Sequence, residues 1–441
     1  MSIPSLPVLV GAAFFAGAAT GGLAALAAES ASKPDLATLK AAFRRPPAIP
    51  FPAENPYSEQ KRSLGEKLFN DKGLSVDGSI ACATCHIRAK GFADGRERGA
   101  GVSGQRLGRH TPTLWNLAWA RPVFWDGRAR TLEQQVFGPI ESPDEMAQPK
   151  AALISRLAAD PDYRQAFAKA FPKDPKVSED HLASALATYE RTLASPPTRF
   201  DRWVEGDDNA LTLQEVQGFR LFTSKAGCAN CHSGFAFTDG NFYDIGLPDA
   251  DRGRGAVLRL PAADHAFKTP GLRELKRSAP YMHDGSLATL DDVLAHYERG
   301  VATRPTVAPD LVRELTLSQE ERGALLAFLA TLSSEDDPQP PSTIAAQTVR
   351  STQAAVRVTT ISQHEKQFSP THVAIKRGSH LWVLNNDTRT HNVRIFDPKL
   401  EFDSGAQEPG ETVEIAFPTT GSFLVFCGIH PKMELHVDVT K

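Results

Sequence analysis

The cysteines of this 441-residue chain stand in three places, and each place includes a histidine. Two of them read C-x-x-C-H, namely Cys82-Ala-Thr-Cys85-His86 and Cys228-Ala-Asn-Cys231-His232. In this motif the two thiols can add to the vinyl groups of a porphyrin while the histidine binds its iron. Because no further cysteine is available to complete a zinc site, the two motifs predict two covalently attached c-type haems.

The third place predicts a different metal. Cys427, His430 and Met433 come from one short loop, and His391 stands in an earlier loop. Two imidazoles, a thiolate and a weakly bound thioether are the ligands of a type 1 copper site. Such a site holds one electron and has no open position, so we expect it to donate or accept electrons rather than to catalyse a reaction.

The N-terminus predicts export. Pro7–Ala28 is almost wholly apolar and ends in Ala25-Leu-Ala27, the small-residue pattern of a cleavage site, so residues 1–28 are interpreted as a secretory signal. No Lys or Arg precedes the apolar stretch, which leaves an uncleaved anchor as the alternative. In both cases we expect the rest of the chain in the periplasm, and we expect no membrane span in the mature chain unless this segment stays uncleaved. The net charge of -3 indicates neither a nucleic-acid partner nor an anionic membrane.

The elements that must position these motifs fall into two kinds. Residues 53–205 and 206–331 show helical periodicity around one haem motif each, and Pro34–Pro52 before them is expected to be an extended lead-in. Residues 332–353 are polar and proline-rich, as in a linker. Residues 354–441 alternate apolar and polar residues in short runs, as in Val356-Val358, Leu381-Val383 and Phe423-Val425, which predicts a small β-sandwich.

Several motifs around the first haem site add a resemblance to a known family. They include Arg109-His-Thr-Pro-Thr-Leu-Trp-Asn116, Phe124-Trp-Asp-Gly-Arg-Ala129, Leu132-Glu-Gln-Gln135 and Ala279-Pro-Tyr-Met-His-Asp-Gly285. Residues 55–330 resemble the bacterial dihaem cytochrome c peroxidases and the MauG-like proteins among them. The C-terminal part resembles cupredoxins, and its short loop is more similar to amicyanin than to plastocyanin. The implied fold is a mostly α pair of cytochrome-c-like domains followed by an all-β cupredoxin Greek-key sandwich.

The resemblance also implies roles for residues above the first haem. Glu145 matches the family's distal acid-base carboxylate, Gln135 and Pro139 match the rest of that pocket, and Trp125 matches the aromatic residue between the haems. Splitting a peroxide O–O bond needs a group that moves a proton, and a carboxyl whose pKa is raised by burial can do so. The alternative interpretation of Glu145 is an exposed acid at a helix start without a catalytic role. The alternative interpretation of Trp125 is a core residue that only packs.

Two positions depart from the classical peroxidase pattern. Val102 occupies the loop position where many members carry an iron-capping histidine, and valine cannot ligate iron; His110 is the nearest substitute. We therefore expect an open first haem that needs no reductive activation, as in MauG-like proteins. Tyr297 stands where classical members place the methionine that binds the second haem. The competing interpretations are that Met282 is the ligand and that Tyr297 is a core residue.

These features leave three functions open. The first is a peroxidase that reduces hydrogen peroxide with electrons relayed from the fused copper domain, which the linker keeps at high effective concentration. The second is a MauG-like oxidase whose high-valent state oxidises a protein or a small molecule, and the third is a non-catalytic electron carrier. A small soluble redox protein is an expected donor or acceptor. The resemblance further suggests a calcium ion near Ser278 and Pro280, where His110 replaces the family's asparagine.

Overall fold

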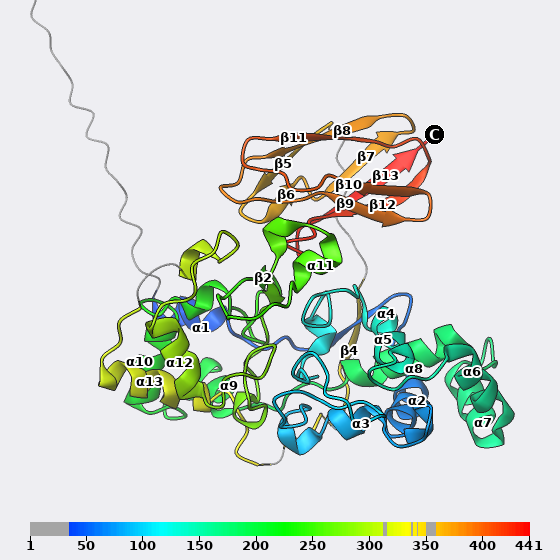
Figure 1. Ribbon diagram of the computed structural model, residues 1–441, viewed down its shortest axis with the longest axis horizontal. Coiled ribbons are helices and arrows are strands. Elements are labelled where there is room, and N and C mark those ends of the chain that lie inside the picture. Colours follow the sequence, from blue (N-terminus) through cyan, green and yellow to red (C-terminus); the bar gives the residue numbers. More distant parts are fainter. Residues whose placement is uncertain (1–34, 312–314, 337, 342, 350–358) are drawn as a thin grey trace, which may run out of the picture.

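The computed structural model describes residues 35–311, 315–336, 338–341, 343–349 and 359–441 (Figure 1). The predicted signal at 1–28 and the predicted strand residues Val356 and Val358 lie outside these described residues. Among the helices in the described part of the chain, none is long and apolar enough to cross a membrane.

The first helical body surrounds the first haem motif. Its helices are α2 (Glu59–Phe69), α3 (Cys82–Cys85), α4 (Leu132–Gln135), α5 (Phe137–Glu141), α6 (Lys150–Ala159), α7 (Pro161–Ala170) and α8 (Glu179–Arg191). The apolar run that includes Leu153 and Phe167 is divided between α6 and α7, because Asp160 caps α7 through its side chain and Pro161 begins it. The apolar faces of α2, α6, α7 and α8 meet in one buried core.

The second helical body surrounds the second haem motif. Its helices are α9 (Arg199–Val204), α10 (Leu213–Phe222), α11 (Arg254–Leu258), α12 (Leu290–Glu298) and α13 (Gln319–Ala330). Its core is largely aromatic and includes Phe200, Phe219, Phe237 and Phe328. Between the helices of both bodies run short 3-10 turns: η1 (Lys72–Leu74), η2 (Arg88–Lys90), η3 (Leu117–Trp119), η4 (Cys228–Asn230), η5 (Pro261–Ala263), η6 (Leu275–Arg277) and η7 (Pro309–Leu311).

The segment before the first body is packed, so the expectation of an extended, unpacked lead-in was wrong. It forms α1 (Leu36–Ala41) and β1 (Ile49–Pro52). Phe43 joins the aromatic core of the second body, and Phe51 is fully buried. β1 pairs in parallel with β4 (Ala346–Val349), which comes from the segment predicted as a linker. The apolar residues Phe43 and Phe51 explain the difference, because their burial fixes a segment whose proline content predicts an open chain.

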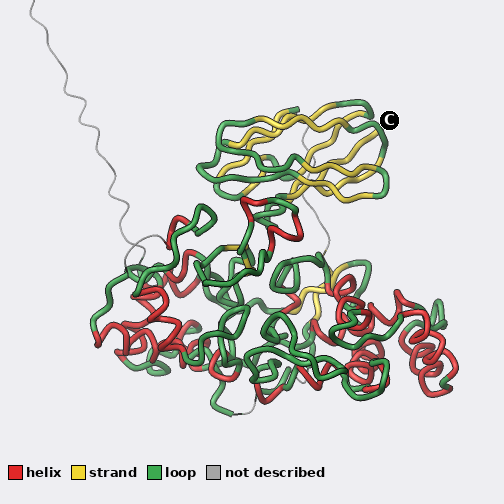
Figure 2. Tube along the Cα trace, in the orientation of Figure 1, coloured by secondary structure: helices red, strands yellow, loops and turns green. Residues whose placement is uncertain are grey.

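The C-terminal domain is a sandwich of two sheets, shown in yellow in Figure 2. One sheet has the strand order β10-β9-β12-β13-β7 and the other β11-β8-β5-β6. Their bounds are β5 (Thr360–His364), β6 (Gln367–Ser369), β7 (His372–Lys376), β8 (His380–Asn385), β9 (Arg394–Asp397), β10 (Leu400–Asp403), β11 (Thr412–Ala416), β12 (Gly421–Phe426) and β13 (Glu434–Thr440). Alternate residues face the shared core, as the burial of Leu381 and Val383 in β8 shows. The predicted β-sandwich is confirmed.

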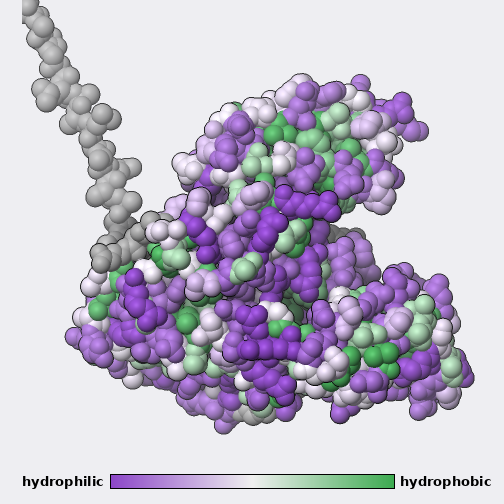
Figure 3. Space-filling model, in the orientation of Figure 1, coloured by the Kyte–Doolittle hydropathy of each residue, from purple (hydrophilic) through white to green (hydrophobic). Residues whose placement is uncertain are grey.

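The sandwich stands out from the helical bodies and joins them beside α11 and the two-stranded antiparallel sheet of β2 (Phe242–Tyr243) and β3 (Phe267–Lys268) (Figures 1 and 3). Lys366 Nζ of the sandwich donates to the Tyr243 hydroxyl over 2.7 Å. Arg130 of the first body forms an ion pair of 3.1 Å with Glu434. The sandwich is therefore docked on the helical part and not only attached to it by the chain.

Candidate haem and copper sites

The two C-x-x-C-H motifs orient their histidines in the same way, although the first forms the α-helix α3 and the second the 3-10 turn η4. α3 begins at Cys82, and His86 Nδ1 lies 2.8 Å from the Phe92 carbonyl oxygen. In the second motif, His232 Nδ1 lies 2.9 Å from the Phe237 carbonyl oxygen. In each case Nε2 is the ring nitrogen that can bind iron. Burial lowers the pKa of both histidines, which keeps them in the neutral form that ligates a metal.

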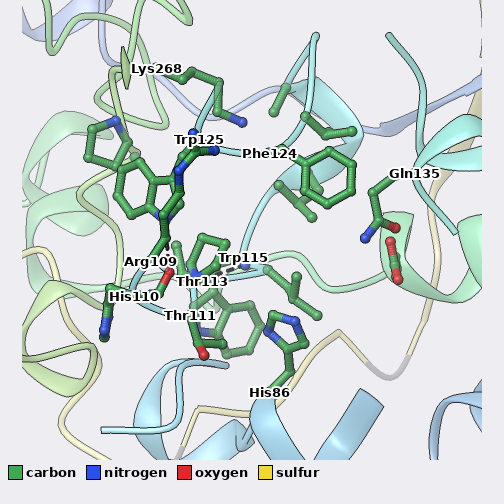
Figure 4. Close-up of a pocket in the computed structure, with 18 of the residues that line it drawn as sticks. His86, Arg109, His110, Thr111, Thr113, Trp115, Phe124, Trp125, Gln135 and Lys268 are labelled. Carbon is green, nitrogen blue, oxygen red and sulfur yellow. Dashed lines mark hydrogen bonds between the residues drawn. The ribbon is translucent and has the colours of Figure 1, made fainter. Parts of the chain in front are cut away.

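A cavity of about 780 Å³ extends from the first motif toward the second body (Figure 4). Its lining includes residues that the sequence singles out around the first haem, together with the calcium candidates Ser278 and Pro280 and the second-haem candidate Met282: Cys82, Cys85, His86, His110, Trp125, Gln135, Pro139 and Glu145. The volume lies within the usual range of cofactor pockets. Two free thiols and a fixed imidazole at the wall of a largely apolar cavity are the donor set that a c-type haem needs. The residues present thus fit the cofactor.

Glu145 lies on this cavity wall directly after α5. Burial raises the pKa of its carboxyl, while the charge of Arg128 opposes that rise. Gln135, at the end of α4, lines the same cavity. The arrangement brings a carboxyl that can hold a proton and an amide that can orient a small ligand into the space beside His86.

The loop that contains Val102 packs against the Glu145 segment. Val102 N donates to the Glu145 carbonyl oxygen over 2.9 Å. A side chain at Gly101 would collide with the Asp144 carbonyl oxygen, so only glycine allows this close approach. His110 lines the same cavity, and its Nδ1 lies 2.8 Å from the Arg96 carbonyl oxygen.

Trp125 lies between the two bodies, on the opposite side of the cavity from Gln135 (Figure 4). The indole Nε1 of Trp125 donates to the His110 carbonyl oxygen over 2.9 Å, and Lys268 N donates to the Trp125 carbonyl oxygen over 2.8 Å. The ring therefore has a fixed orientation.

The two candidate ligands of the second haem lie in different places. Tyr297, on α12, lies near Cys228 and Cys231, and burial raises the pKa of its phenol. Met282 lines the large cavity instead. The ligand of the second haem stays a prediction, with Tyr297 as the expected residue and Met282 as the alternative.

The copper ligands converge in the sandwich. His391 Nδ1 and His430 Nδ1 each lie 3.7 Å from Cys427 Sγ, and they lie 2.9 Å from each other. All three residues are buried, and so is Met433 in the same loop. Within the described residues this is the one group of three or more His, Cys, Asp or Glu side chains whose ligand atoms meet closely enough to hold a metal. The set His₂Cys plus a methionine fits type 1 copper.

A second layer of contacts orients these ligands. His391 Nε2 lies 3.1 Å from the Asp387 carboxylate, which leaves Nδ1 for the metal. Cys427 Sγ accepts the backbone N–H groups of His430 at 3.3 Å and Asn392 at 3.5 Å. Such donors stabilise a thiolate in a buried site.

Two residues of the cavity wall were missed by the sequence reasoning. Glu190, on α8, is buried and lines the cavity near Cys82, and burial raises its pKa to about 8. Lys432, in the copper loop, lines the same cavity although it belongs to another domain. No motif marks either residue, because only the packing of α8 and the docking of the sandwich bring them there.

Comparison with known proteins gives the family. Residues 59–209 match the family model described as di-haem cytochrome c peroxidase, under the name CCP_MauG. The methylamine utilization protein MauG of Methylorubrum extorquens is 46% identical over 315 residues, which are 71% of this chain and 89% of the relative. The chain belongs to the dihaem cytochrome c peroxidase and MauG family. The predicted resemblance is thereby confirmed, and with it the class of oxidoreductase and the two c-type haems.

Further members agree. The cytochrome c551 peroxidase of Pseudomonas aeruginosa is 38% identical over 250 residues, which are 54% of this chain and 72% of that peroxidase. A crystal structure of a MauG-like protein associated with microbial copper homeostasis superposes with a TM-score of 0.61 at 32% identity, over 66% of this chain and 94% of that one. These matches confirm the predicted helical fold of the dihaem part.

Proposed function

We propose that this family member is an exported peroxidase that reduces hydrogen peroxide to water with electrons from its own copper domain. One observation carries the proposal. Glu145 and Gln135 line the same cavity as His86, so a proton-carrying group stands beside the site of the first haem. Relatives named as peroxidases support hydrogen peroxide as the substrate. The apolar segment at the N-terminus supports export to the periplasm.

Several residues of the first body would each have a separate role in this reaction. When bound through Cys82, Cys85 and His86, the haem supplies the iron at which peroxide is reduced. The Phe92 carbonyl holds the His86 ring in place, and Glu145 takes a proton from one peroxide oxygen and returns it to the other. Gln135 orients the small substrate, and Pro139 and the apolar wall exclude bulk water. The overall reaction consumes one peroxide, two protons and two electrons and produces two waters.

The copper domain would supply the electrons. His391, Cys427, His430 and Met433 would hold one copper ion, and the Asp387 contact would fix the ring of His391. Because the site stores one electron, it must deliver twice for each peroxide. A small soluble electron carrier would recharge it.

A MauG-like oxidase is the second candidate function. It is favoured by the position of Tyr297 next to Cys228 and Cys231, and by the 46% identity with MauG. A phenolate ligand favours the oxidised state of iron, which suits an enzyme that removes electrons from a substrate. In that case the copper domain would accept electrons instead of donating them.

The test is peroxide consumption by the fully loaded protein with its copper reduced beforehand. Glu145→Gln is expected to slow turnover by about 10²- to 10⁴-fold, the usual contribution of a general acid-base group. The matched control is Glu141→Gln, an exposed residue at the end of α5, four residues before Glu145. Unchanged turnover in Glu145→Gln would exclude its role.

The same experiment separates the candidate functions. A peroxidase oxidises two equivalents of reduced copper for each peroxide. An oxidase consumes peroxide without oxidising the copper and needs an added organic or protein substrate. An electron carrier consumes no peroxide at a catalytic rate.

A further inference from the structure

The copper loop is turned toward the helical part of the molecule and not toward solvent. His391 is fully buried and His430 is only 5% exposed. Ile429, between two copper ligands, packs against the apolar cluster of Leu258, Leu260 and Ala263. A side chain at Gly428 would approach Leu258 Cδ2 to 2.8 Å, so this glycine allows the loop to lie directly on α11.

One buried side chain connects this loop with the space between the haem bodies. Arg254, on α11, is 4% exposed. Its Nε donates to the Gly428 carbonyl oxygen over 2.8 Å, and its Nη1 donates to the carbonyl oxygens of Asp126 at 3.0 Å and Gly127 at 2.7 Å. A guanidinium has a rigid fork of donors and can hold three carbonyl groups at once.

The carboxylate of Asp126 forms ion pairs with other arginines and not with Arg254. It is bound instead by Arg109 at 2.6 Å and Arg128 at 3.0 Å. Arg254 is thus used to join backbone segments, at the cost of burying a charge with no carboxylate of its own.

Both ends of the connection matter for electron transfer. Gly428 is covalently next to Cys427, the thiolate of the copper site. Asp126 is covalently next to Trp125, whose ring lines the haem cavity. The connection therefore contains one side chain and two short non-covalent steps, all of them buried.

A second connection runs toward the other haem. Asp387, which contacts His391, accepts from Lys366 N, and Lys366 Nζ donates to the Tyr243 hydroxyl. Tyr243 in turn donates to Asp239, whose N–H donates to the Cys231 carbonyl oxygen. This connection has more non-covalent steps and passes through a partly exposed lysine. Electronic coupling weakens at each non-covalent gap, and the connection from the copper loop to the Trp125 segment through Arg254 has fewer gaps, so we expect it to couple the sites more strongly.

We infer that Arg254 is a positioning residue for internal electron transfer, through which the copper site exchanges electrons with the dihaem part at the Trp125 segment. This inference shares one assumption with the proposed function, namely that the copper and haem sites are filled. In the measurable direction, one electron leaves a reduced haem iron, which becomes ferric, and enters Cu(II), which becomes Cu(I). The same connection serves the opposite direction, because coupling does not depend on which site is the donor.

The experiment uses the full-length holoprotein and no peroxide, so its result is independent of peroxidase activity. A radiolysis pulse places one electron on the haems of the oxidised protein, and the bleaching of the blue Cu(II) band is followed. In the wild type the bleaching should be first order and independent of protein concentration. Arg254→Met should lose most of this fast phase while the copper and haem spectra stay unchanged.

Two control variants make the result specific. Arg252→Met removes a half-exposed arginine two residues away that pairs with Asp264, and Lys366→Met interrupts the second connection. Both should keep the fast phase. A wild-type rate in Arg254→Met, or a larger loss in Lys366→Met, would overturn the inference.

If Arg254→Met does not fold, the Arg254→Lys variant tests the inference instead. It keeps the buried cation, but one ammonium cannot span Gly428 and the two carbonyls beside Trp125. We expect its rate to fall below that of the wild type, and an unchanged rate would equally overturn the inference.

Discussion

At the scale of single residues, burial controls the ionisable groups of the haem cavity. Burial raises the pKa of Glu145, and it raises the pKa of Glu190 to about 8. Both carboxyls therefore keep a proton under conditions in which an exposed glutamate has lost it. Glu145 can use that proton on a substrate, while Glu190 lies near Cys82 and affects stability as well.

Glu190 predicts a pH-dependent stability. Its folded pKa of about 8 lies above the ordinary value of 4.5, so only the folded state holds the proton between these values. The stability that this group contributes is present below pH 4.5 and is lost as the pH rises toward 8. In thermal unfolding of the holoprotein, Glu190→Gln should raise Tm by about 2–4 °C at roughly pH 9, the shift for about 1 kcal/mol. The difference should vanish near pH 4.5.

The control for this prediction is Asp180→Asn, an exposed residue on the same helix, which should leave the pH dependence of Tm unchanged. A Glu190→Gln variant whose Tm difference is the same at every pH would contradict the prediction.

Tyr297 predicts a redox effect. Burial raises the pKa of its phenol, so a phenolate there requires a cation such as iron. If Tyr297 binds the second haem, Tyr297→Phe should raise the reduction potential of that haem by about 59 mV or more, a tenfold change in a one-electron equilibrium. Met282→Leu should leave the potential and the spectrum unchanged. Potentiometric titration of both variants checks this, and the reverse pattern would assign the ligand to Met282.

At the scale of elements, each helical body contains one close helix crossing that depends on glycine. Gly65 on α2 lies against Ala185 of α8, and Gly218 on α10 lies against Ala324 of α13. In both crossings an added side chain would collide with the backbone of the partner helix. In both haem bodies, therefore, two helices cross closely at a glycine that has no room for a side chain.

The crossing predicts a large effect of a small change. Gly218→Ala should destabilise the second body by about 1–3 kcal/mol, the usual cost of overpacking a core. Gly323→Ala, on the facing helix, is the matched control because its added side chain would meet only the end of Gln214 at 3.6 Å. It should be neutral or stabilise by roughly 0.4–1 kcal/mol. Chemical denaturation followed by the haem absorption checks both, and equal stabilities would show that the crossing can relax.

At the scale of the whole molecule, the docked sandwich decides which metal sites communicate. The interface includes the apolar contact of Ile429 with Leu258 and the ion pair of Arg130 with Glu434. Docking also brings Lys432 to the haem cavity. Without it, the copper domain would be a tethered carrier that meets the haems only by diffusion.

The interface can be opened by one substitution. Leu258→Asp places an unpaired charge in the apolar cluster, a change that is expected to release the sandwich. Small-angle scattering should then show a larger radius of gyration than in the wild type. The control Leu213→Asp changes a leucine that is 91% exposed and should leave the radius unchanged. An equal radius in Leu258→Asp would mean that the polar contacts alone hold the domains together.

The sequence alone determined the chemistry that is written in local motifs. The spacing of Cys82, Cys85 and His86 specifies haem attachment because the three groups react within one turn of chain, whatever the rest of the fold does. The alternation in Leu381-Val383 and Phe423-Val425 likewise specifies strands, because side-chain direction repeats every two residues. The resemblance to the family supplied the roles of Glu145 and Tyr297, which stay predictions.

Only the tertiary structure decided what depends on contacts between distant segments. The lead-in was predicted as open chain, yet Phe43 and Phe51 bury themselves in cores formed by residues far along the sequence. Glu190 reaches the haem cavity through the packing of α8, and Arg254 joins residues 126, 127 and 428 through the docking of the sandwich. No local pattern marks such residues, because burial and backbone bonding at these positions are set by segments that meet only in the folded chain.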